Sequence, residues 1–182
     1  MKLFFRICLP TSVFAALSLI FATLIVGGGV EQEMFLGGYV YTPRNLHTEG
    51  GTAAYRIWFL PGDDRGLSII YPQPLTLGFE ARGGYLWKPE NAWEASIMID
   101  LKYEFNLIEN IAIYLLGSTG GNYSGVEYES VATHYNFINR GSLGICIYQA
   151  IIQTSYEHRS NAGLEQPNRG VDLIRVSAGY RF

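Results

Sequence analysis

Hydrophobic and polar residues alternate with a period of two along much of the chain after Val30. In the clearest run, 93–105, the odd positions are apolar and the even positions are mostly charged or polar. The run 75–87 alternates in the same way with Leu86 as its exception, and so does the C-terminal run 174–182. This pattern predicts β-strands that present one apolar and one polar face.

These runs are long for strands. The run 93–105 is about twice the usual length of a strand in a globular sheet, and strands of this length with one apolar face suit a tilted crossing of a bilayer. The chain ends on Tyr180, Arg181 and Phe182, which resembles the terminal aromatic assembly signal of bacterial outer-membrane barrels. We therefore predict an all-β fold, an eight-stranded antiparallel transmembrane β-barrel.

The connections between strands support a barrel with both termini in the periplasm. Short periplasmic turns are expected near 106–110 and at 139–141, and a long outer connection from 118 to about 132. The expected strands are roughly 34–43, 52–60, 66–87, 92–106, 110–118, 133–138, 143–160 and 171–182. Side chains fill the interior of such a barrel, so function belongs on its wall or rim.

The N-terminal segment predicts export. Lys2 and Arg6 precede an apolar run from 7 to about 26, and glycines follow. We expect residues 1–29 to be a cleaved signal peptide and residues 30–182 to be the mature barrel, a retained transmembrane helix being the alternative. The mature chain then keeps only Cys146, which excludes an intramolecular disulfide and a multi-thiolate metal site.

The composition agrees with a membrane barrel, because only 16% of residues are charged and 14% are aromatic. No basic run points to nucleic acid. The tryptophans Trp58, Trp87 and Trp93 are expected in the interfacial girdle. Four charged residues of the 93–105 run are expected to pair inside the lumen: Glu94, Asp100, Lys102 and Glu104.

The run 143–160 carries the candidate chemistry. Its late even positions are mainly apolar and should face lipid, and the same register places His158 and Ser160 on that face. Residues two apart on a strand lie about 6.5 Å apart with parallel side chains, so an imidazole there can act as general base for the hydroxyl. An antiparallel return can bring Asp172 beside His158, where a carboxylate would orient the imidazole.

The segment 158–170, followed by an alternating strand that ends in Tyr-Arg-Phe, resembles the signature of the lipid A 3-O-deacylase (PagL-like) family. The resemblance implies an outer-membrane barrel with a Ser-His-Glu triad on its outer wall. It assigns Ser160 as nucleophile and His158 as base, and its glutamate falls at Asp172, a shorter side chain. The resemblance also implies an oxyanion or substrate-orienting role for Asn161, Gly163 and Asn168. Glu165 is a weaker substitute for Asp172.

The resemblance thus implies a cell outer-membrane esterase that removes the 3-O-linked 3-hydroxyacyl chain from the lipid A of lipopolysaccharide. It implies no metal and no cofactor, and it leaves a homodimer open. The alternatives are a non-catalytic structural or adhesive barrel with a lapsed site, and a soluble lipocalin-like carrier. Loss of activity on replacement of Ser160 separates the esterase from the structural barrel.

Overall fold

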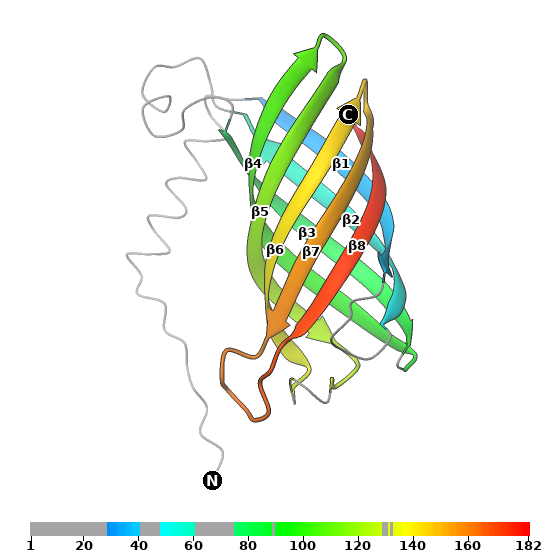
Figure 1. Cartoon of the computed structure of the whole chain (residues 1–182), viewed down its shortest axis with the longest axis vertical. Coiled ribbons are helices and arrows are strands. Elements are labelled where there is room, and N and C mark those ends of the chain that lie inside the picture. Colours follow the sequence, from blue (N-terminus) through cyan, green and yellow to red (C-terminus); the bar gives the residue numbers. More distant parts are fainter. Residues whose placement is uncertain (1–28, 41–47, 61–74, 89, 129–130, 132) are drawn as a thin grey trace, which may run out of the picture.

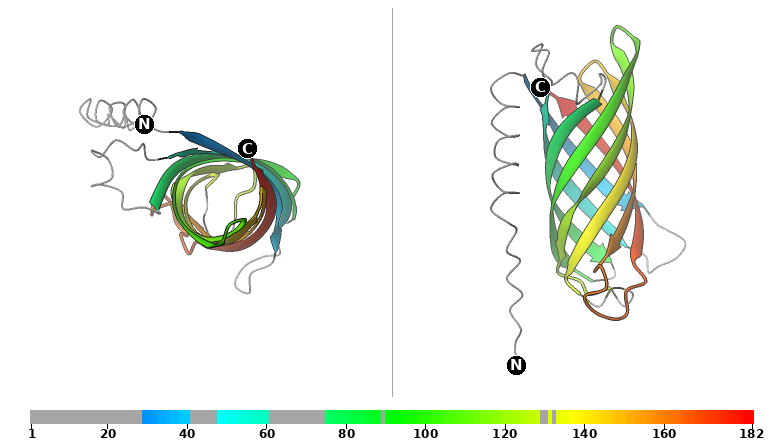
Figure 2. Two further views of the ribbon diagram at one scale, coloured as in Figure 1. Left: turned by 90° about the horizontal axis from the view of Figure 1, so that it is seen from above. Right: turned by 90° about the vertical axis from the view of Figure 1, so that its left-hand side faces the viewer.

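A computed structural model describes residues 29–40, 48–60, 75–88, 90–128, 131 and 133–182. They form a closed antiparallel barrel in which neighbours pair in chain order and β8 pairs with β1 (Figures 1 and 2). The strands are β1 Val30–Val40, β2 Glu49–Phe59, β3 Leu75–Lys88, β4 Ala92–Ile108, β5 Ile111–Ser124, β6 Tyr135–Ile147, β7 Ala150–Ser160 and β8 Val171–Arg181. The predicted fold class is confirmed. Within the described ranges, no helix has the length and apolar composition needed to span a membrane.

Several predicted boundaries are wrong. The strand expected at 66–87 is present from Leu75 to Lys88, and its predicted residues 66–74 lie outside the described residues, as do 1–28 of the predicted signal peptide. The fifth strand continues to Ser124 instead of ending near 118, so the outer connection that follows it is shorter than expected. The turn predicted near 106–110 is confirmed at Glu109 and Asn110.

The turn predicted at 139–141 is also wrong, because these residues lie inside β6. The inward side chain of Arg140 bonds Glu80 and Asp100, which fixes this stretch as a strand. The chain reverses instead at Tyr148 and Gln149, so the predicted strand 143–160 is two strands, and outward positions change from odd to even across this turn. Tyr148 adopts a positive φ of 54°, in a turn without the Asn-Gly or Asp-Gly pair that marks such hairpins in a sequence.

The outer wall is apolar, as the alternation predicts. Large outward side chains include Leu36, Trp93 and Ile97, which are 70%, 72% and 69% exposed. Trp87 is half exposed and agrees with the predicted girdle, whereas Trp58 is fully buried. The prediction for Trp58 was wrong because its strand position points inward, where its ring lies 4.3 Å from the Lys102 ammonium, a cation–π contact.

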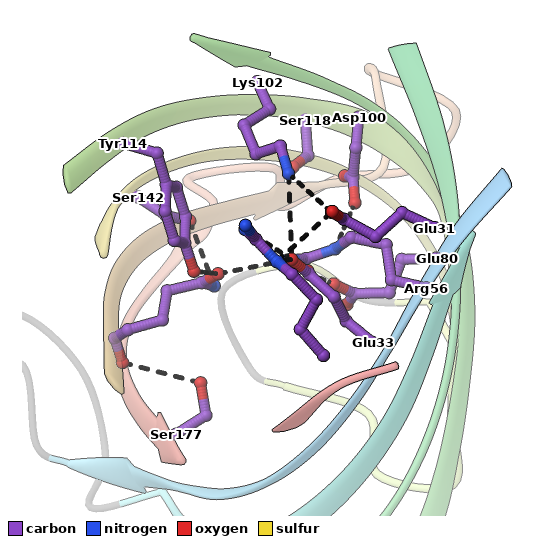
Figure 3. Close-up of polar contacts among 12 residues, drawn as sticks. Glu31, Glu33, Arg56, Glu80, Asp100, Lys102, Tyr114, Ser118, Ser142 and Ser177 are labelled. Carbon is purple, nitrogen blue, oxygen red and sulfur yellow. Dashed lines mark hydrogen bonds and ion pairs between the residues drawn. The ribbon is translucent and has the colours of Figure 1, made fainter. Parts of the chain in front are cut away.

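Ion pairs and hydrogen bonds between buried charged side chains cross the lumen (Figure 3). Arg56 binds Glu33, Glu80 and Asp100, all fully buried. Arg140 shares Glu80 and Asp100 with it, and nearer the periplasmic end Lys102 and Arg181 bind Glu31, Glu33 and Glu104. The predicted pairing of Glu94, Asp100, Lys102 and Glu104 is confirmed.

The outer mouth is closed by the connection between β5 and β6. Val126, Tyr128 and Val131 of this segment are almost fully buried and pack against Tyr39, Leu86, Val171 and Leu173 of the barrel. We call these three residues the plug. Burial raises the pKa of the Tyr128 hydroxyl, which therefore stays neutral in this apolar setting.

Candidate active site

The candidate residues lie at the mouth end of β7 and the start of β8. Successive residues of β7 alternate between lumen and wall, so Glu157 and Arg159 are fully buried while His158 and Ser160 face outward and are partly exposed. The buried pair anchors the strand: Arg159 binds Glu157 at 2.7 Å and Glu94 at 2.8 Å across the lumen. The two outward side chains therefore stand on a strand whose inner face is held by ion pairs.

His158 and Asp172 are directly opposite one another in the antiparallel pairing of β7 and β8. The Nδ1 atom of His158 lies 2.7 Å from Oδ1 of Asp172. A carboxylate only accepts hydrogen bonds, so Nδ1 is the donor, and in the neutral ring this leaves Nε2 as the acceptor. Asp172 is 18% exposed and His158 is 41% exposed, so the pair is shielded on one side and open on the other. The predicted return of Asp172 to His158 is confirmed.

Ser160 follows His158 on the same face, in register with Phe137 of β6. Within the described part of the chain, Ser160 and His158 share no hydrogen bond. Such bonds are often formed only when substrate binds, and the separation expected for residues two apart, about 6.5 Å between Cα atoms, is one that the imidazole and hydroxyl can bridge.

The turn after Ser160 is organised by Asn161, whose side chain is fully buried. Its amide group donates to the carbonyl of Val131 in the plug at 2.5 Å and to that of Glu165 at 2.9 Å. Its amide oxygen accepts from the backbone N–H of Gly163 at 2.9 Å. Asn161 thus ties the turn to the plug and does not face the wall.

Asn168 holds the same turn from its other side. Its Oδ1 accepts from the backbone N–H of Asn161 at 3.0 Å, and the N–H of Leu164 donates to the carbonyl of Asn161 at 3.1 Å. Ala162 and Gly163 both have positive φ, 53° and 81°. The side chain of Glu165 is exposed, and it is Asp172 that contacts His158.

Gly170 lies against the imidazole, a contact that the sequence did not predict. Its φ is 75°, and a Cβ added there would collide with Cε1 of His158 and lie 2.9 Å from Nε2. Gly163 has a similar φ, but a Cβ there would have no neighbour within 4 Å. Both glycines have a positive φ, so their backbone conformation is alike, and only their surroundings distinguish them.

The one other histidine within the described ranges, His134, is separate from this pair. His134 lies beyond the mouth end of β5, where Nδ1 is 2.8 Å from the carbonyl of Ser124 and Nε2 is 3.4 Å from Glu127. His47 lies outside the described residues. Over the described ranges, no three His, Cys, Asp or Glu side chains converge as metal ligands would.

Comparisons with known proteins agree with the barrel. Residues 49–181 match the family model described as lipid A 3-O-deacylase (PagL), and no curated protein sequence matches significantly. The crystal structure of the outer membrane enzyme PagL is 18% identical, with a TM-score of 0.60, and covers 81% of this chain and 98% of its own. The structure of Neisserial surface protein A is 12% identical, with a TM-score of 0.53, and covers 84% and 94%. These two structures establish the shared fold.

Proposed function

The chain belongs to the lipid A 3-O-deacylase family and is an outer-membrane β-barrel, and from this premise we propose that it is an esterase that removes the 3-O-linked 3-hydroxyacyl chain from lipid A. The observation that carries the proposal is the 2.7 Å bond between His158 and Asp172, beside the outward Ser160. A charged side chain on a lipid-facing wall is unfavourable, so this arrangement calls for a role.

In the proposed reaction, the Ser160 hydroxyl attacks the ester carbonyl while Nε2 of His158 takes its proton. The tetrahedral intermediate collapses, and the bond between the acyl carbon and the sugar oxygen breaks. His158 gives the proton to this oxygen, which leaves as the sugar hydroxyl. A water molecule, deprotonated by His158, then attacks the acyl-enzyme ester. The bond between the acyl carbon and Oγ of Ser160 breaks, His158 returns the proton to that Oγ, and the 3-hydroxy fatty acid leaves. Asp172 holds the imidazole by Nδ1 and stabilises its cationic form during both steps.

The aspartate is a compatible replacement for the family's glutamate. Side chains directly opposite in an antiparallel pair have Cβ atoms about 4.5–5.5 Å apart. A short carboxylate at position 172 therefore reaches the imidazole from across the pairing, and the Nδ1–Oδ1 distance of 2.7 Å is that of a charge-assisted hydrogen bond.

The turn 161–170 is the proposed source of oxyanion stabilisation. Backbone N–H groups aimed at the developing negative charge are the usual donors. The N–H of Gly163 already donates to Oδ1 of Asn161, so an oxyanion would have to compete with that amide for it. We assign Asn161 and Asn168 an orienting role: they hold the turn that carries these N–H groups.

Mass spectrometry of lipid A from a Gram-negative host tests the proposal. Expression of the native chain should remove the mass of one 3-hydroxyacyl group, and Ser160→Ala should abolish the loss. Thr154→Val is the matched control, because Thr154 is an outward hydroxyl on the same strand that is remote from His158. Unchanged lipid A beside a folded native barrel would refute the esterase and favour a structural or adhesive barrel.

A further inference from the structure

An apolar groove crosses the outer wall beside the candidate site. It has a volume of about 700 Å³ and runs over β6, β5, β4 and β3, which are consecutive neighbours in the barrel (Figure 1). Its outward lining consists of Phe137, Tyr135, Tyr123, Gly121, Ile97, Ala95, Gly83, Ala81 and, from the turn 161–170, Leu164. Phe137 is the pairing partner of Ser160, so the groove begins one strand from the proposed nucleophile.

The floor of the groove is made of small residues and its sides of large ones. A Cβ added at Gly121 or Gly83 would have no neighbour within 4 Å, so both positions open outward. Beside them stand Tyr123 and Tyr135, whose rings pack edge to face at 5.2 Å, and Ile97, which is 69% exposed. The result is a channel lined with hydrocarbon and aromatic surface.

The register of the strands gives the groove a direction. Starting from Ser160, the row of directly paired residues passes through Phe137, Gly121, Ile97 and Ala81. Continued around the barrel through Tyr55, Met34 and Tyr180, it returns to β7 at Ala150, at the other end of the strand. The row therefore descends from the mouth toward the periplasmic end, and Gly121 is the gap in it between the outward side chains of Phe137 and Ile97.

We propose that this groove binds the acyl chain that is cleaved, and that Gly121 sets the chain length it accepts. The inference rests on the proposed function. Strands are about 4.8 Å apart, so Gly121 lies roughly 10 Å from Ser160 along the row, whereas Gly83 lies off the row, two residues from Ala81 on β3. An extended chain advances about 1.25 Å per carbon, so Gly121 meets the chain at about carbon 8.

The lipid hydrocarbon around the groove determines how the groove can select acyl chains by length. An acyl chain outside the groove still lies in hydrocarbon, so occupancy gains packing contacts rather than escape from water. Selection by length must then be steric: a side chain at a floor position blocks the groove for chains that reach it and leaves shorter chains untouched. The effect should therefore depend on the position of the glycine along the row.

The test compares kcat/KM of the purified full chain on lipid A substrates that differ only in the 3-O-linked chain, of about eight or about fourteen carbons, on either side of the Gly121 limit. Gly121→Leu should lower kcat/KM for the long chain by at least about tenfold, the lower range for steric discrimination in a hydrophobic pocket. It should change the value for the short chain by less than about threefold. Gly121→Ala should act in the same direction with a smaller effect, and Gly83→Leu should spare both chains.

Gly141→Leu is the matched control. Gly141 lies on β6 and, like Gly121, is an outward glycine whose added Cβ would have no neighbour within 4 Å, but it lies outside the groove. It should leave both values unchanged, and every variant is first checked for the folded barrel by its heat-modifiable migration in gel electrophoresis. If the ratio of kcat/KM for the long and short chains is the same in Gly121→Leu as in the native protein, the proposed groove is overturned. It is also overturned if Gly141→Leu lowers kcat/KM for the long chain selectively, because the acyl chain would then lie straight down the wall over Gly141. If the native chain releases neither acyl group, the proposed function itself fails.

Discussion

Replacing Gly170 by alanine should separate the geometry of the imidazole from the stability of the barrel. The added Cβ would lie 2.9 Å from Nε2 of His158 and closer still to Cε1. The ring is held at Nδ1 by Asp172, so it must swing about that bond, and Nε2 must move by roughly 0.5–1 Å to restore an ordinary contact. A misplacement of about 1 Å costs on the order of 100-fold in rate, which corresponds to about 2.7 kcal/mol of transition-state stabilisation.

The variant also has a backbone cost, because alanine at a φ of 75° is strained by about 1–3 kcal/mol. Gly163→Ala provides the comparison for this part: its φ is 81° and its added Cβ touches nothing. The two variants should lose similar free energy of unfolding in urea titrations of the refolded barrel. Only Gly170→Ala places a methyl group against the imidazole.

The assay is the initial rate of fatty-acid release from lipid A in detergent, normalised to the folded fraction. We expect kcat/KM of Gly170→Ala to fall about 100-fold, mostly in kcat, because the misplaced group acts in the chemical step. A native rate per folded molecule would refute the reasoning, since the ring would then tolerate the methyl group. A fall in rate that only matched the loss of folded protein would refute it equally.

The remaining predictions concern the charge partner, the turn and the lumen. Asp172→Asn should lower kcat by about 1,000- to 10,000-fold, whereas Asp172→Glu should stay within about tenfold of native because a longer carboxylate can still reach the ring; steady-state kinetics on lipid A checks both. Asn161→Ala removes three hydrogen bonds of a buried side chain and should cost about 2–4 kcal/mol, seen as a lower urea midpoint and faster proteolysis of the turn. Arg159→Met leaves buried carboxylates without their partner and should cost about 3–5 kcal/mol. Arg175→Met should be neutral or stabilising in the same titration, because its three buried guanidinium nitrogens have no hydrogen bond in the described structure, and Glu80, 3.8 Å away, keeps Arg56 and Arg140 as partners.

The alternation of side chains made the barrel predictable. A period of two fixes which residues share a face, and one strand register extended by two positions was enough to put His158 and Ser160 on the wall. The same reasoning brought Asp172 back to His158, because a short antiparallel return admits few registers. These inferences depend only on local geometry, which the sequence carries directly.

The wrong predictions concern features that the alternation of side chains does not determine. The Tyr148 turn was missed because a residue without a turn signature adopts a positive φ there, and Trp58 was misplaced because an aromatic residue suits both a membrane interface and a lumen that contains cations. The contact of Gly170 with His158 and that of Asn161 with Val131 depend on how two segments distant in sequence meet. Sequence periodicity contains no information about such tertiary contacts.

The outward position of His158 and Ser160 determines which measure of substrate concentration sets the reaction rate. A site on the wall of a barrel meets its substrate by lateral diffusion within one leaflet, so the encounter rate follows the mole fraction of lipid A in that leaflet and not its amount per volume. Diluting lipid A with inert detergent at constant total lipid A should therefore slow the reaction. In the intact envelope, crowding and packing of the outer leaflet would set the turnover, and a change in leaflet composition would act on the rate without any change in the protein.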